Sequence, residues 1–198
     1  MHEPQVQGEH MAIVIPFPLD RVRQAEPERE NSEESTVTDL PPTRGAKKQA
    51  SRARNVSLHA LSQRAVSRKE LEDRLESRGL EEDLISQEIG ALSGSGLIDD
   101  RALAHDLVDR YFQRGALGRR AVGLKLRARG LPEEIIREAL DTIDEESEEN
   151  VLRALAQRKV ESLVGESREA RSRKLGSYLL RKGFEPSRVY DLVRELTG

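Results

Sequence analysis

Apolar residues recur at helical spacing along most of the chain, and one short stretch shows the pattern clearly. In the segment 118–130, Val122 and Leu126 lie four positions apart, so they share one face of a helix. Gly118 stands where this helix is expected to begin. Gly130 stands where it is expected to end, because glycine readily adopts the left-handed conformation that is common just after a helix. The pattern predicts a helix that is buried along one side.

The same pattern occurs three times. Segments 67–79 (SRKELEDRLESRG), 118–130 (GRRAVGLKLRARG) and 171–183 (RSRKLGSYLLRKG) align on their closing glycines, which lie 51 and 53 positions apart (79 to 130, 130 to 183). Two apolar positions, a basic residue before the glycine and an apolar residue after it correspond in all copies. In chain order these are Leu71, Val122 and Leu175; Leu75, Leu126 and Leu179; Arg78, Arg129 and Lys182; and Leu80, Leu131 and Phe184. Matched positions at such a period indicate a tandem helical repeat.

A helix precedes each copy and another follows its closing glycine, so each repeat has three helices. The chain is therefore expected to be all-α, with three tandem three-helix modules in an elongated or curved stack, preceded by a disordered N-terminal tail. The expected divisions are an acidic tail and basic linker at residues 1–55, then modules at 56–97, 98–143 and 144–198.

The folded part is expected to begin near Ser57. A short amphipathic helix comes first, with apolar positions at Leu58, Leu61 and Ala65. Ser67 followed by Glu70 then has the capping-box pattern, in which each residue satisfies a backbone N–H of the other at a helix start.

The N-terminal segment has a different composition. Residues 1–43 are acidic and rich in proline. Such a segment buries too little apolar surface to offset its ordering entropy, so we expect it to be disordered. Within it, the apolar island 13–19 (IVIPFPL) is either unstructured or a short docking peptide. The basic run 44–54 that follows either binds a phosphate backbone or is a solvated linker.

The composition limits the class of protein. The 198 residues include no cysteine, which excludes a disulfide framework and a thiolate metal site. No apolar run reaches the roughly 20 residues of a membrane-spanning helix, and no signal peptide begins the chain. These features predict a soluble cytoplasmic protein.

No catalytic constellation is recognisable. His59 and His105 are isolated on predicted helices, where a lone histidine is more often structural than a ligand. Asp99 and Asp100 are better explained as a helix N-cap and a first-turn acid, because the helix dipole favours negative charge there. The chain also lacks a phosphate-binding glycine loop and any metal-ligand spacing. We therefore expect no enzyme activity, no cofactor and no metal.

Three stretches carry a resemblance to a known family. The LIDD sequence at 97–100, the GRR sequence at 118–120 and the RGLPEE turn at 129–134 are similar to those of the RecX family of bacterial regulatory proteins. The resemblance covers residues 57–198 and is weakest in the third module, where Gly176 lies inside a helix.

This resemblance implies a function that the charges and the repeats do not show by themselves. Members of the family bind RecA and modulate its recombinase and ATPase activities, usually as inhibitors, in DNA repair, recombination and the SOS response. They are thought to lodge in the groove of the RecA–DNA filament. The expected partner is thus the RecA filament, with contact to single-stranded DNA inside it possible, and the chain is expected to be a monomer without membrane contact.

The residues 118–130 also form the most one-sided charge pattern. The corresponding helix of the first module mixes acidic and basic residues, whereas this one has basic residues only, so acidic protein or phosphate is expected to neutralise it. The candidate contacts to RecA or DNA are Arg110, Arg114, Arg119, Arg120, Lys125, Arg127, Arg129, Arg173, Lys174, Arg181 and Lys182.

Three functional classes remain open at this point. The first is a regulator that docks in the RecA filament. The second is a stand-alone DNA-binding protein with helix-turn-helix-like modules, although the basic helix has few side chains suited to reading base edges. The third is a structural adaptor whose basic face is merely solvated.

Overall fold

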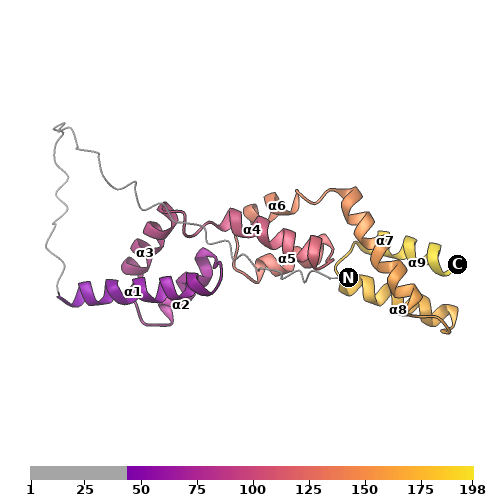
Figure 1. Cartoon of the computed structure of the whole chain (residues 1–198), viewed down its shortest axis with the longest axis horizontal. Helices are drawn as coiled ribbons and strands as arrows, with labels where there is room; N and C mark the ends of the chain where they lie inside the picture. The colour runs from indigo at the N-terminus through magenta and orange to yellow at the C-terminus, as the bar shows by residue number, and fades with distance from the viewer. Residues whose placement is uncertain (1–43) are drawn as a thin grey trace, which may run out of the picture. The chain divides into compact units, whose positions relative to one another are not determined.

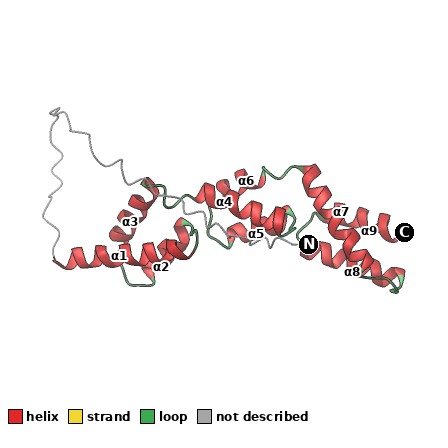
Figure 2. Ribbon diagram, in the orientation of Figure 1, coloured by secondary structure: helices red, strands yellow, loops and turns green. Residues whose placement is uncertain are grey.

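The computed structural model describes residues 44–198, and every regular element in that range is helical (Figure 2). No helix in this range is long and apolar enough to cross a membrane. The N-terminal tail and its apolar island lie outside the described residues. The elements are α1 (Arg44–Gln63), α2 (Arg68–Glu76), α3 (Glu82–Gly94), α4 (Asp100–Val108), the π-helical turn η1 (Asp109–Arg114), α5 (Arg119–Arg127), α6 (Glu133–Leu140), α7 (Glu145–Glu161), α8 (Arg168–Arg181) and α9 (Pro186–Thr197).

The helices pack as three successive modules, which confirms the predicted repeat. Module 1 comprises α1 to α3, module 2 comprises α4, η1, α5 and α6, and module 3 comprises α7 to α9 (Figure 1). Each module has its own cluster of buried apolar side chains. Extensive helix packing is confined to single modules, so the modules meet through a small number of residues.

The middle helix of each module occupies the centre of that module's core. The two matched apolar positions of every copy are completely buried, as in Leu71, Val122 and Leu175. The closing glycines Gly79, Gly130 and Gly183 have φ of 72°, 68° and 86°. This left-handed geometry reverses the chain at each helix exit, as the sequence predicts. The Ser67–Glu70 capping box is also present.

The first helix differs from the prediction. The basic run 44–54, expected to lie in a linker, forms the first half of α1. Its buried residues are Ala53, Ser57 and Ala60, whereas Leu58 is 46% exposed. Small side chains at positions spaced by three and four allow α1 to approach α2 and α3 closely. Because alanine and serine contribute little to an apolar pattern, the sequence missed this buried face and predicted too late a start, although Leu61 packs against the core as expected.

The chain is helical from Asp100 to Arg114, but the helix type changes within this range. The first part is α4, and the second part is the π-helical turn η1. This turn buries Phe112 at 2% exposure, and Ala116 follows with φ of 46°. A wider turn and a left-handed residue bring the chain to the start of α5.

Candidate partner-binding surface

The α5 helix has one buried and one cationic side, as its sequence predicts. Val122, Gly123 and Leu126 face the core of module 2, and Gly118 occupies the N-cap position. The remaining positions carry four cations and no carboxylate between Arg119 and Arg127. Several of the candidate cations are nevertheless paired within the molecule.

Arg129 joins modules 1 and 2. Its guanidinium donates two hydrogen bonds to the Glu70 carboxylate, at 2.6 and 2.8 Å, and only 16% of its side chain is exposed. Arg64 pairs with the same carboxylate. Burial of Glu70 raises its pKa, but hydrogen bonds from Arg129, Arg64 and the Ser67 backbone outweigh this effect and lower the pKa to about 2. Arg129 is therefore a structural residue rather than a free contact.

Arg119 has a comparable role between modules 2 and 3. Its backbone N–H donates to the Glu148 carboxylate at 2.7 Å, and its guanidinium donates to the Ile143 carbonyl. The equivalent residue of module 1, Arg68, donates its backbone N–H to the Asp100 carboxylate at 2.9 Å. In both places a carboxylate from the next module neutralises the start of a middle helix.

The glycine ends of the middle helices complete these junctions. The N–H of Gly118 donates to the Lys182 carbonyl (2.9 Å), and the N–H of Arg120 donates to the Gly183 carbonyl (3.2 Å). At the other junction, the Ser67 hydroxyl donates to the Arg129 carbonyl at 2.5 Å. The C-terminal end of each middle helix thus meets the N-terminal end of the preceding one, so their dipoles are complementary.

Further candidate cations form ion pairs on the surface. Arg127 pairs with Glu133, and hydrogen bonds between them raise the pKa of the arginine and lower that of the carboxyl. Two other candidates pair in the same way, and one lies beside an aromatic ring. These are Arg114 with Asp109, Lys174 with Glu166, and Lys182 at 5.9 Å from the centre of the Tyr178 ring.

Two cations of α5 make no ion pair among the described residues, and they flank an exposed leucine. Arg120 and Lys125 are exposed, and Leu124 between them is 65% exposed. Arg120 and Leu124 line a depression of about 400 Å³, together with Gly123 and Leu140. We call Arg120, Leu124 and Lys125 the α5 surface. An exposed leucine between two unpaired cations is suited to contact with a protein surface that combines carboxylates with an apolar pocket.

Module 3 carries a similar but more polar area. Arg173 and Arg181 are exposed and unpaired within the described chain, and they line a depression of about 300 Å³ with Lys159 and Ser177. Arg173 occupies the repeat position of Arg120, ten residues before the closing glycine. The last candidate, Arg110, is exposed on η1 and away from both depressions.

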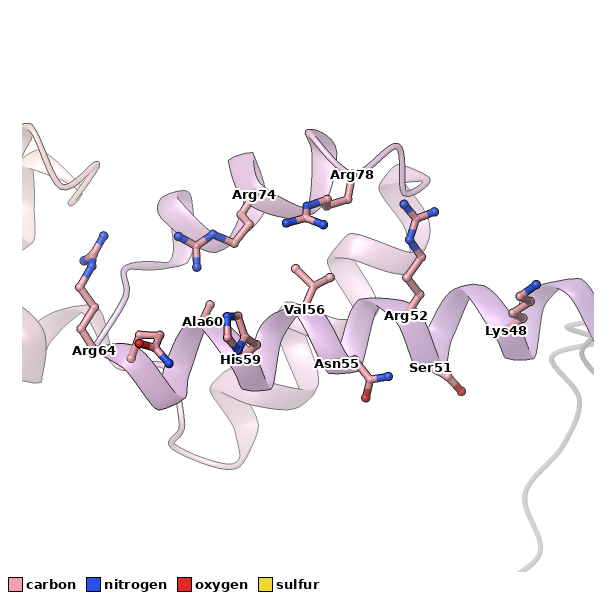
Figure 3. Close-up of a pocket in the computed structure, with 11 residues that line it drawn as sticks. Lys48, Ser51, Arg52, Asn55, Val56, His59, Ala60, Arg64, Arg74 and Arg78 are labelled. Atoms are coloured by element: carbon pink, nitrogen blue, oxygen red, sulfur yellow. The ribbon is translucent and has the colours of Figure 1, made fainter.

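A third basic area includes part of the basic run 44–54. A depression of about 840 Å³ lies between α1 and α2, where Arg52, Arg64, Arg74 and Arg78 converge (Figure 3). The sequence left this run open between phosphate binding and a solvated linker, and gave no sign that Arg74 and Arg78 lie opposite it. The missed signal is the absence of any Asp or Glu from all 20 residues of α1.

No group of three or more His, Asp or Glu side chains in the described range is placed to hold a metal ion. His59 is the only described histidine that borders the α1–α2 groove, and His105 lies exposed on α4. Asp99 caps α4 by accepting the Ala102 N–H, as expected from the sequence.

Comparisons with known proteins agree with this architecture. Profiles for the first, second and third three-helix domains of RecX match residues 53–91, 99–140 and 146–193. The regulatory protein RecX of Thermobifida fusca is 33% identical over 73% of this chain and 78% of its own. The regulatory protein RecX of Mycolicibacterium smegmatis is 33% identical over 83% of this chain and 90% of its own length. A crystal structure of RecX from Lactobacillus salivarius superposes with a TM-score of 0.68 at 27% identity, covering 76% of this chain and 97% of that one.

Proposed function

The chain belongs to the RecX family of regulatory proteins, and from this membership we propose that it binds RecA and its DNA filament. In this proposal it inhibits the recombinase and ATPase activities of RecA during DNA repair and recombination, in the cytoplasm. It acts by binding, without a cofactor or a catalytic residue of its own.

The α5 surface is the observation that carries the proposal. Arg120 and Lys125 have no carboxylate within ion-pair distance among the described residues, although the other cations of α5 do. A partner that supplies carboxylates gains these two contacts without breaking an internal pair. The exposed Leu124 favours a protein over naked phosphate at this place, because burying an apolar side chain stabilises a protein interface.

The basic area of module 3 supports a second set of contacts. The residues that line this depression are cationic apart from one serine, and none is a leucine. Arg173 and Arg181 are therefore equally suited to bind DNA phosphates or RecA carboxylates. A filament of RecA on single-stranded DNA presents both kinds of group. The chain therefore needs no separate binding partner for this area.

The proposal is tested by single-strand-dependent ATP hydrolysis and strand exchange by RecA, with and without this chain. We expect both rates to fall as the chain is added. The proposal is wrong if neither rate changes while sedimentation shows no binding of the chain to filaments. Equal inhibition in an assay with a RecA-independent single-strand-dependent ATPase would instead indicate sequestration of DNA.

A further inference from the structure

The groove between α1 and α2 concentrates cations without carboxylates. It is lined by Lys48, Ser51, Arg52, Asn55, Val56, His59, Ala60, Gln63, Arg64, Arg74 and Arg78. Arginines from the two helices face each other across it (Figure 3). Facing cations repel one another, so an anionic ligand would stabilise this arrangement.

Most of these cations are available to a ligand. Arg64 is paired with Glu70, but Lys48, Arg52, Arg74 and Arg78 form no ion pair in the described part of the chain. By contrast Lys69, on the opposite part of α2, is held by two carboxylates. Module 1 therefore neutralises one side of α2 internally and leaves the other side cationic.

The space between the cations is not uniformly polar. Val56 and Ala60 lie between the arginines, and the His59 ring borders them (Figure 3). A flat nucleobase can stack on an apolar surface, an imidazole or a guanidinium plane while its phosphate is held by arginine forks. The carboxylate side chains of an acidic peptide would pair with the cations but would leave this apolar surface uncovered.

The dimensions suit a short strand. From Lys48 to Gln63 the groove follows fifteen residues of α1, which is about 22 Å at ~1.5 Å per residue. At ~3.4 Å per stacked nucleotide this length accommodates roughly six nucleotides. We propose that the α1–α2 groove is a binding site for single-stranded nucleic acid, with phosphates on Arg52, Arg74 and Arg78 and bases over Val56. This site goes beyond the proposed function, because it requires no RecA.

The test measures binding of the full chain to a fluorescent twelve-nucleotide oligo(dT), without RecA, over a range of salt concentrations. The groove variant is Arg52→Gln/Arg74→Gln/Arg78→Gln. The matched control, Lys47→Gln/Arg54→Gln/Arg158→Gln, removes three exposed cations outside the groove, two of them on α1. Circular dichroism melts verify that both variants fold, since exposed charges contribute little to stability.

We expect the groove variant to lose affinity about a hundredfold at ~0.1 M salt. We also expect its slope of log K against log salt to become shallower by about two, since each lost phosphate contact contributes ~0.7. The control variant should retain the parental slope. Equal losses in both variants, or no loss in the groove variant, would overturn the proposal. Displacement of the oligonucleotide by a polyglutamate peptide at equal charge concentration would overturn it in favour of an acidic peptide site.

This outcome is separable from the RecA proposal. A groove variant that loses oligo(dT) binding but still inhibits RecA supports the nucleic acid site and keeps the α5 surface as the protein contact. A parent chain that binds oligo(dT) through the groove but leaves RecA unaffected also supports the site, while the proposed function fails.

Discussion

At the scale of single residues, Glu70 connects three partners from two modules. Its carboxylate accepts hydrogen bonds from Arg64 and Arg129, and from the Ser67 backbone at the start of α2. One side chain thus completes a capping box inside module 1 and an ion pair to module 2. The capping role was predictable from the local sequence, whereas the pair with Arg129 was not, because 59 residues separate them.

This pairing predicts a pH-dependent stability difference between the parent and Glu70→Gln. Because the folded-state pKa of Glu70 is lowered from 4.5 to about 2, its ionised form stabilises the fold at pH above ~4.5. The contribution should shrink as the pH falls below 4.5 and disappear near pH 2. Melting temperatures of both proteins at pH 7, 4 and 2.5 would measure it. A constant difference across this range would show that Glu70 does not act through its charge.

Replacing a closing glycine with alanine should destabilise the fold by different amounts at different modules. Gly79 has open space where the methyl group of an alanine would lie, so Gly79→Ala should cost only the left-handed strain, about 1–2 kcal/mol. At Gly183 the added carbon would collide with the backbone and side chain of Ala121 in the neighbouring module. Gly183→Ala should therefore destabilise more than Gly79→Ala in urea unfolding. Equal urea midpoints for the two variants would mean that the junction at Gly183 rearranges around the added methyl group without loss of stability.

At the scale of elements, α5 separates folding from binding on two sides of one helix. Leu126 is completely buried, and Leu124, two positions earlier, is 65% exposed. Leu126→Ala should cost about 2–5 kcal/mol, because it removes buried apolar contacts and leaves a cavity. Leu124→Ala should change stability by less than ~0.5 kcal/mol. Urea midpoints check both, and similar losses for the two variants would mean that the buried face is wrongly assigned.

The elements also show what sequence patterns can predict. Leu and Val at repeated spacing, with a glycine at each exit, were enough to predict the middle helices and their buried faces. The α1 helix was mispredicted because its contacts use Ala53, Ser57 and Ala60, whose small side chains resemble solvent-exposed positions. The pairing of Arg119 and Arg129 depends on residues in other modules, which no local pattern reveals.

The revised α1 predicts a consequence for truncation. A chain beginning at residue 57 lacks the first 13 residues of α1, including Ala53, which is 1% exposed in the core of module 1. It should melt at a lower temperature than a chain beginning at residue 44, with loss of helical signal from module 1. Calorimetry and circular dichroism of the two truncations would measure this. Identical melting would contradict the placement of Ala53.

At the scale of the molecule, two junctions repeat the same construction. In each, the glycine end of one middle helix meets the start of the preceding middle helix, and a carboxylate of the next module accepts a backbone N–H there. Repetition of this kind lets adjacent modules share one geometry while their outer surfaces diverge. Side chains of unpaired cations gather on the α5 surface, on module 3 and in the α1–α2 groove.

Affinity for a RecA filament on single-stranded DNA, measured for the parent and for Arg120→Gln/Lys125→Gln, tests the central claim most directly. The control, Lys47→Gln/Arg158→Gln, carries the same change of charge outside the α5 surface. We expect the α5 variant to bind at least about tenfold more weakly, a loss of ~1.4 kcal/mol, and the control to bind like the parent. An α5 variant that binds filaments as tightly as the parent would contradict the assignment of the α5 surface as the contact with RecA.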